Sequence, residues 1–171
     1  MKKILIFLLA LICFGCQQKE DPSYYYHLSM GGVEVIPGYT KVSELVDLSF
    51  EAPEELGPGE DIYAELYDSG YSVGEIRIFN PSEEKAPLGD CRVVYIDLYK
   101  VFYGDIFLDE ELLSDSIKEN CETRGGTYFY QNGYACKLEK KSHSRTSVII
   151  LHGDISAMDQ DLVDRVEVFA E

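Results

Sequence analysis

The order of hydrophobic and polar residues predicts several short strands in the body of the chain. Hydrophobic residues alternate with polar ones in three segments, which is typical of strands with one buried face. These positions are Ile76/Ile78, Val94/Ile96/Leu98 and Val166/Val168. The continuous run at residues 148–151 indicates a strand that is buried more completely.

Two similar segments predict β-hairpins. Residues 67–71 read YDSGY, and residues 130–134 read YQNGY 63 positions later. Each turn is flanked by tyrosines and aliphatic residues, as in a hairpin. Asn132-Gly133 is the stronger turn pair, because a type I′ turn needs positive φ at both central positions. The repeat indicates an internal duplication.

A strand and then a helix are expected before each hairpin. In the first copy, residues 32–36 read as a strand, and Thr40 caps a helix that extends to residue 49. In the second copy, residues 103–108 read as a strand and residues 112–121 as a helix. The apolar stripes are Leu45/Leu48 and Leu113/Ile117. Helices this short need a sheet to pack on.

These elements together predict an α+β protein built from two strand–helix–antiparallel-sheet units, with a helix packed on one face of each sheet. The units are residues 24–86 and residues 87–171, joined by the Pro- and Gly-containing segment 81–90. This order resembles the tandem fold of the β-lactamase inhibitory protein and, more distantly, the small outer-membrane lipoproteins of the barrel-assembly machinery. The resemblance lies in element order and the hairpin repeat, and it implies no functional residue.

The first sixteen residues follow a different pattern. Lys2 and Lys3 precede an unbroken apolar run at residues 4–14, which Gly15 and Cys16 close. A basic start, an apolar core and a small residue at the cut are the parts of an export signal. The run is shorter than the roughly 20 apolar residues that a bilayer span requires. We therefore predict a signal peptide at residues 1–15.

The position of Cys16 resembles the lipobox of bacterial lipoproteins, although Cys13 stands where that family usually has leucine and Phe14 where it usually has a small residue. The resemblance implies cleavage before Cys16 and acylation of this residue, for example by palmitate. The resemblance also implies that Gln17, where an aspartate would favour the inner membrane, directs the protein to the outer membrane with the domain facing the periplasm. Residues 16–23 then form a lipidated tether. The alternative is an ordinary secretory leader that is cut elsewhere.

Composition limits the partners. Without Lys2 and Lys3 the chain has 13 basic and 31 acidic residues, a formal charge of −18. Such a field repels nucleic acid and attracts basic partners, although acidity also serves solubility. Apolar content is too high for a disordered acidic tail. We expect a folded domain whose contact with the membrane is the lipid on Cys16.

Three cysteines follow Cys16, and none has CxxC spacing. In an oxidising compartment an odd number indicates a disulfide and a leftover thiol. The expected bridge is Cys121–Cys136, which ties the end of a helix to a strand and leaves Cys91 free. It would contribute about 3 kcal/mol in the chain-entropy model. Three buried free thiols are the alternative.

Motifs for catalysis or metal binding are weak. Residues 70–74 match G-x-S-x-G around Ser72, but the context is strand–turn–strand rather than the strand-to-helix turn of a hydrolase. His152-Gly153-Asp154 places an imidazole near a carboxylate, yet neither HxH nor HExxH occurs. We predict no metal or cofactor. The acidic clusters at residues 54–55, 83–84 and 109–111 are interpreted as solvated surfaces.

Two features point to protein binding. Lys137, Lys140, Lys141 and Arg145 form a basic cluster, either a recognition loop for an acidic partner or lipid head groups, or lysines that guard a sheet edge. All 13 tyrosines lie between Tyr24 and Tyr134. Rows of them on an open sheet would make a protein-binding face, although strand tyrosines often serve packing.

The function predicted from the sequence is therefore a non-enzymatic, lipid-anchored envelope protein that binds another protein, with a basic partner favoured. An inhibitor, an immunity protein and an assembly factor all fit this description. The alternatives are an envelope hydrolase that uses Ser72 or His152 and a structural lipoprotein without a dedicated ligand.

Overall fold

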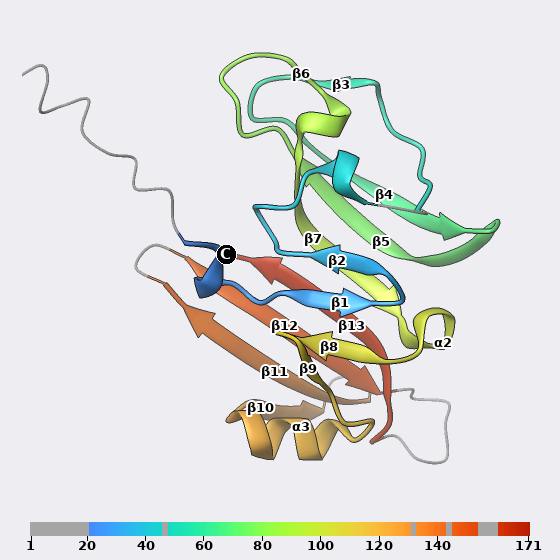
Figure 1. The fold of residues 1–171 in the computed structure, drawn as a ribbon, viewed down its shortest axis with the longest axis vertical. Helices are drawn as coiled ribbons and strands as arrows, with labels where there is room; N and C mark the ends of the chain where they lie inside the picture. Colours follow the sequence, from blue (N-terminus) through green and yellow to red (C-terminus); the bar gives the residue numbers. More distant parts are fainter. Residues whose placement is uncertain (1–20, 46–47, 131–132, 143–144, 154–160) are drawn as a thin grey trace, which may run out of the picture.

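The computed structural model describes residues 21–45, 48–130, 133–142, 145–153 and 161–171. The predicted signal peptide and Cys16 lie outside these ranges. Strands dominate the described chain, and they form three antiparallel sheets (Figure 1). Within the described ranges, no helix has the length and apolar character that crossing a membrane requires.

The largest sheet has seven strands in the order β10-β11-β12-β13-β7-β5-β4, and we call it the large sheet. Its strands are β4 (Asp61–Asp68), β5 (Tyr71–Phe79), β7 (Arg92–Tyr99), β10 (Thr127–Tyr130), β11 (Tyr134–Lys141), β12 (Thr146–Gly153) and β13 (Val163–Ala170). The two tyrosine-flanked hairpins, β4–β5 and β10–β11, therefore form the opposite edges of one sheet. In the β4–β5 turn, Ser69 and Gly70 both have positive φ, as a type I′ turn requires.

A small sheet of four strands, in the order β2-β1-β8-β9, packs across one face of the large sheet (Figure 1). Its strands are β1 (Leu28–Met30), β2 (Val33–Val35), β8 (Ile106–Leu108) and β9 (Glu111–Leu112). Both sheets contribute to a single hydrophobic core, in which Met30 and Leu108 of the small sheet join Ile96 and Val168 of the large sheet. The other face of the large sheet, which we call the outer face, points away from this core.

The remaining elements are short. β3 (Glu55–Leu56) pairs with β6 (Ala86–Pro87). Single 3-10 turns lie at η1 (Pro22–Tyr24), η2 (Val42–Glu44) and η3 (Leu88–Asp90). The α-helices among the described residues are α2 (Lys100–Tyr103) and α3 (Ile117–Arg124), and α3 contacts β10 and β11.

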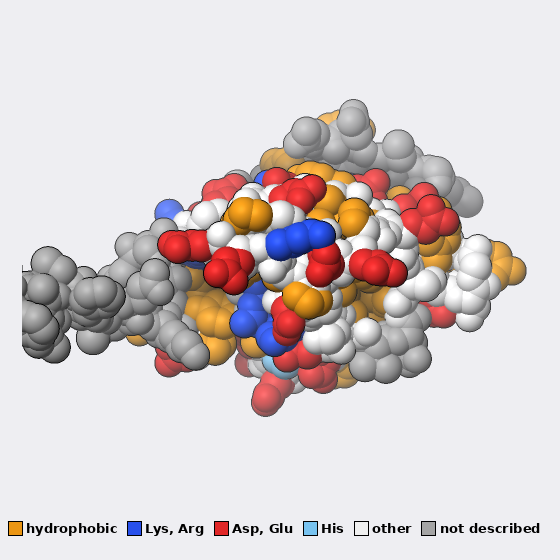
Figure 2. Space-filling view, turned by 90° about the horizontal axis from the view of Figure 1, so that it is seen from above, with side chains coloured by type: hydrophobic (Ala, Val, Ile, Leu, Met, Phe, Trp, Pro, Cys, Tyr) orange, Lys and Arg blue, Asp and Glu red, His pale blue; other side chains and the backbone are white. Residues whose placement is uncertain are grey.

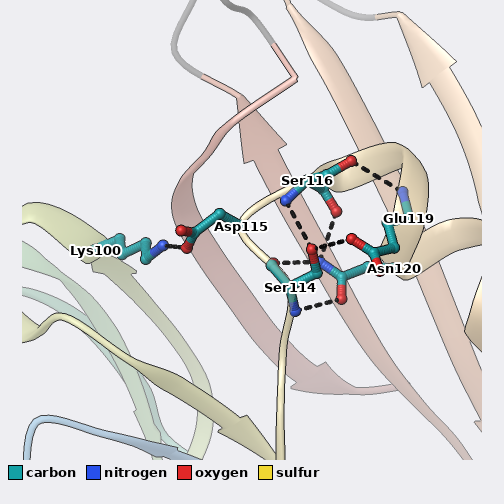
Figure 3. A network of polar contacts seen from close by, with 6 residues as sticks. All are labelled: Lys100, Ser114, Asp115, Ser116, Glu119 and Asn120. Atoms are coloured by element: carbon teal, nitrogen blue, oxygen red, sulfur yellow. Dashed lines mark hydrogen bonds and ion pairs between the residues drawn. The ribbon is translucent and has the colours of Figure 1, made fainter.

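A polar network determines where α3 begins (Figure 3). The Ser116 hydroxyl accepts a hydrogen bond from the Glu119 amide, as an N-cap does. The buried Asn120 amide group donates to the carbonyls of Ser114 and Ser116, at 2.7 and 2.9 Å. Gly125 ends the helix in the left-handed conformation.

The predicted α+β arrangement of two strand–helix–sheet units is wrong. Strands from both sides of the expected boundary at residues 86/87 combine in each of the larger sheets, because β5 pairs with β7 and β1 pairs with β8. The boundary itself falls within β6. The two similar hairpins thus belong to one predominantly β structure with a shared core.

The predicted helices are also largely absent from the described residues. In the described part of the expected helix at residues 40–49, which leaves out 46–47, η2 is the one helical turn, and the Thr40 hydroxyl accepts from the Ile36 amide instead of capping a helix. In the second copy, the expected helix at residues 112–121 starts late, because Leu112 belongs to β9 and the cap is Ser116. The expected strand at residues 103–108 shortens to β8, preceded by α2.

Cys121 and Cys136 form a disulfide with a Cα–Cα distance of 5.7 Å, the pairing that the sequence favoured. The bond ties α3 to β11, and Cys91 remains a buried free thiol. Burial raises the pKa of the Cys91 thiol, so this group stays protonated at neutral pH.

Candidate functional site

An aromatic row crosses the outer face of the large sheet. Tyr63, Arg77, Tyr95 and Phe169 are cross-strand neighbours on β4, β5, β7 and β13. The ring of Tyr95 lies 6.3 Å from that of Tyr63 and 6.3 Å from that of Phe169, centroid to centroid. The Arg77 guanidinium lies 5.3 Å from the centroid of the Tyr63 ring, within the range of a cation–π contact.

The aromatic row lines a shallow groove of about 470 Å³, whose walls include Glu167 and Glu171. Tyr63 is 66% exposed, which is high for a tyrosine in a strand. Asp61 fixes Arg77 from the β4 side, with 2.6 Å between its Oδ2 and the arginine Nε. The groove therefore offers aromatic surface held in place by cross-strand contacts and bordered by carboxylates.

A polar cluster of four residues occupies the same face beside the row. The Arg165 guanidinium on β13 lies between two carboxylates, 3.1 Å from Asp97 Oδ2 and 3.1 Å from Glu167 Oε1. His152 Nε2 on β12 lies 2.9 Å from the same Glu167 oxygen. This contact has the distance of an ion pair but the geometry of a poor hydrogen bond. Three neighbouring strands thus supply one charge network.

Burial controls the charges in this network. Asp97 is only 4% exposed, and its Oδ1 has no hydrogen-bond partner among the described residues. Burial raises the pKa of Asp97 to about 7, against the opposing effect of Arg165. Burial also acts to raise the pKa of Glu167, but the close contact with His152, together with the charge of Arg165, holds that pKa below its ordinary value. Of the two carboxylates beside Arg165, Glu167 therefore has the lowered pKa and Asp97 is the weaker acid.

Ser72 does not lie in the geometry of a hydrolase nucleophile. Its hydroxyl donates to the Glu65 carboxylate on the neighbouring strand. The motif lies at the start of β5 rather than at a strand-to-helix turn. Its last glycine has a structural reason: a Cβ at Gly74 would lie 1.8 Å from the Asp97 carbonyl oxygen, and φ there is +155°. Only glycine permits this approach of β5 to β7.

The two residues proposed for the hydrolase alternative are also far apart. Ser72 is on β5 and His152 on β12, with β7 and β13 between these strands. Three strand spacings correspond to about 14 Å. The carboxylate beside His152 is Glu167, and Asp154 falls outside the described residues. In the part of the chain that the structure describes, no group of three or more His, Cys, Asp and Glu residues is placed to hold a metal ion.

The basic cluster is spread along β11 and the turn before β12, and its lysines contact acids of the same chain. Lys137 and Lys141 both lie near Glu139, at 2.7 and 3.7 Å. Lys140 lies 2.6 Å from Asp109 and 4.8 Å from the centroid of the Tyr26 ring. Arg145 contributes its backbone to the β11–β12 turn, where its amide donates to the Ser142 hydroxyl. These contacts favour a structural role for the cluster.

The tyrosines divide among several places. Tyr63 and Tyr95 lie in the aromatic row, whereas Tyr134 at the β10–β11 edge stacks on Tyr128 and meets Tyr130 edge-on. Others are buried, such as Tyr25, which contacts Tyr39 at 4.9 Å between ring centroids. Sequence reasoning missed Arg77, Asp97, Arg165 and Glu167. A signal was present for two of them, because Arg165 and Glu167 alternate with valines along β13 and this pattern places both on the face opposite the core.

Comparison with known proteins finds no family model, no curated protein and no solved structure that matches this chain.

Proposed function

We propose that this chain is a lipid-anchored protein of the bacterial envelope that binds a basic protein through the outer face of the large sheet. Anchoring would use Cys16, with the outer membrane and a periplasm-facing domain favoured. Inhibitors, immunity proteins and assembly factors act in this way without chemistry of their own. The observation that carries the proposal is the aromatic row, with Tyr63 exposed and carboxylates on both sides.

Charge supports a basic partner. The chain after the leader carries −18, and acidic side chains are dispersed among hydrophobic ones over the end of the molecule seen in Figure 2. Acids accelerate the approach of a basic partner, and aromatic side chains supply much of the energy once contact is made. The polar cluster lies beside this surface, where Arg165 joins β13 to β7 through Asp97.

Affinity capture from envelope extract tests the proposal, with two tyrosines as a matched pair. Tyr63 and Tyr130 are equally exposed, at 66% each, but Tyr63 is in the aromatic row and Tyr130 is on the β10 edge. We expect Tyr63→Ser to weaken capture of a stoichiometric basic protein at least tenfold, as the loss of a central aromatic residue does. Tyr130→Ser should leave capture unchanged.

Capture should also fall as salt rises, because ions screen the attraction between the exposed charges. Equal loss in both tyrosine variants, or capture that is insensitive to salt, would contradict binding through this face.

A further inference from the structure

The outer edge of β4 is an open hydrogen-bonding edge of the large sheet. β4 is the end strand on this side, and it pairs with β5 along its whole length. Among the described residues, Ser49 is the residue that bridges to the other side of β4, at Tyr67. The Tyr67 amide donates to the Ser49 carbonyl at 2.8 Å and the Tyr67 carbonyl accepts from the Ser49 amide at 2.9 Å. Tyr67 therefore directs its backbone groups away from β5.

Backbone groups alternate along a strand, so residues 61, 63 and 65 direct theirs to the same side as Tyr67. The Glu60 carbonyl agrees with this alternation, because it points to the β5 side and accepts from the Asn80 amide at 2.9 Å. Within the described part of the chain, the Ser49 bridge covers only Tyr67. With respect to the described residues, the N–H and C=O groups of Asp61, Tyr63 and Glu65 thus form an unpaired row.

The residues that protect this edge against strand pairing are acidic, and the lysines and prolines that often serve this purpose do not occur on it. Natural proteins keep edge strands short or place lysine and proline on them. β4 has eight residues, DIYAELYD, without lysine, arginine or proline. Its outward backbone positions carry Asp61, Tyr63 and Glu65, and the Tyr63 ring belongs to the aromatic row. The open backbone row and the groove are therefore continuous.

We propose that the β4 edge binds an extended basic segment of a partner protein, which adds to the large sheet as an eighth strand beyond the seven present. This inference deepens the proposed function and rests on it. Lysine or arginine side chains at alternate positions of the added strand would lie opposite Asp61 and Glu65, and an aromatic residue between them would lie opposite Tyr63. Main-chain hydrogen bonds supply affinity in strand addition, and the alternate side chains supply specificity.

Charge disfavours a second copy of this chain as the occupant. If two β4 strands paired antiparallel about Tyr63, Asp61 of each copy would lie directly opposite Glu65 of the other. Like charges in directly opposed positions destabilise a strand pair. The same carboxylates stabilise a strand that carries basic residues at those positions.

Amide hydrogen exchange measured by NMR tests the proposal on the full chain purified in detergent. The probe is a seven-residue peptide, Thr-Lys-Val-Tyr-Val-Lys-Thr, and the control peptide has glutamate in place of both lysines. We expect the lysine peptide to slow exchange of the Tyr63 and Glu65 amides at least about tenfold at saturation. The Ala64 amide, which faces β5, should not change.

Two variants at one position separate the backbone from the ring. Tyr63→Pro removes the outward N–H at a place where an edge strand tolerates proline, and Tyr63→Thr keeps that N–H while it also removes the ring. Binding of the lysine peptide should be lost in Tyr63→Pro and retained, with weaker affinity, in Tyr63→Thr.

Equal peptide binding by these variants, no protection at Tyr63 and Glu65, or equal protection by the glutamate peptide would overturn strand addition. Self-association of the chain that protects the same amides would assign the edge to a second copy. If Tyr63→Ser loses the captured partner while Tyr63→Pro and Tyr63→Thr bind the peptide equally, strand addition fails and the proposed function stands. If no basic partner is captured at all, the proposed function fails, and the peptide result still decides the chemistry of the edge.

Discussion

Asp97 makes the stability of this protein depend on pH in a direction opposite to that of an ordinary ion-paired carboxylate. Its pKa is about 7 in the folded state, against an ordinary value of 3.8, because it is buried. Between these values the folded chain holds a proton that the unfolded chain has released. The free energy of unfolding therefore falls as pH rises through this window. Below pH 3.8 the contribution is fully present, and above pH 7 it is lost.

Asp97→Asn removes this dependence, because the amide is nearly isosteric with the protonated carboxyl and stays neutral. A shift of about 3 pKa units at 1.36 kcal/mol each bounds the effect at about 4 kcal/mol. Between about pH 4.5 and pH 7.5, the stability of the variant relative to wild type should rise by about 3 kcal/mol. Other carboxylates titrate in both proteins and largely cancel from the difference.

Urea unfolding at both pH values measures this difference. The chain has 13 tyrosines and no tryptophan, so far-ultraviolet circular dichroism and tyrosine fluorescence are the suitable probes. Asp105→Asn is the control, since Asp105 is exposed and its replacement should alter stability equally at both pH values. The reasoning fails if Asp97→Asn shows the same difference from wild type at both pH values, because Arg165 would then keep Asp97 ionised throughout.

Three further outcomes follow from the structure and the sequence. In thermal unfolding, Gly74→Ala should destabilise the fold by more than about 3 kcal/mol, because its Cβ would collide with the Asp97 carbonyl. Gly70→Ala is the control: its Cβ would meet no atom within 4 Å, and the positive φ alone should cost about 1 kcal/mol. Replacing Cys121 and Cys136 together by serine should lower stability by about 3 kcal/mol for this 15-residue separation, and reductant should lower the melting temperature of wild type but not of the double variant. Cys16→Ala should abolish incorporation of labelled palmitate and release the protein from the membrane fraction, whereas a variant that still sediments with membranes would refute lipid anchoring.

Local patterns predicted the strands better than the helices. The alternation at Ile76/Ile78 and Val166/Val168 matches buried positions of β5 and β13, and the run at residues 148–151 lies in β12. Val94 broke the expected alternation, because a register shift opposite Arg77 and Ile78 leaves Val93 in the core instead. The prediction of a helix from Leu45 and Leu48 was wrong. Their three-residue spacing also occurs in irregular chain, and both leucines are partly buried against the core here.

Strand order was beyond reach, because pairing between distant segments leaves no trace in local periodicity. Nothing near Arg165 indicates that Asp97 is its neighbour, 68 positions earlier, and yet these residues meet because β13 enters beside β7. The polar cluster could not be predicted for the same reason, and non-local pairing also places the two similar hairpins in one sheet. The sequence indicated strands that carry tyrosines. The row that Tyr63 forms with Tyr95 and Phe169 could not be predicted, because it depends on the order of the strands in the sheet.

The position of β13 has a consequence for how the nascent chain matures. This strand is the last of the described strands in chain order, and it inserts between β7 and β12 in the interior of the large sheet. Until it arrives, β4–β5–β7 and β10–β11–β12 are separate blocks, each with a hydrophobic strand border exposed to solvent. Such borders attract other chains and chaperones during synthesis or export. We therefore expect the sheet to close late in folding. Deletion of residues 163–170 should leave two separate strand blocks that are prone to aggregation, instead of a locally frayed end.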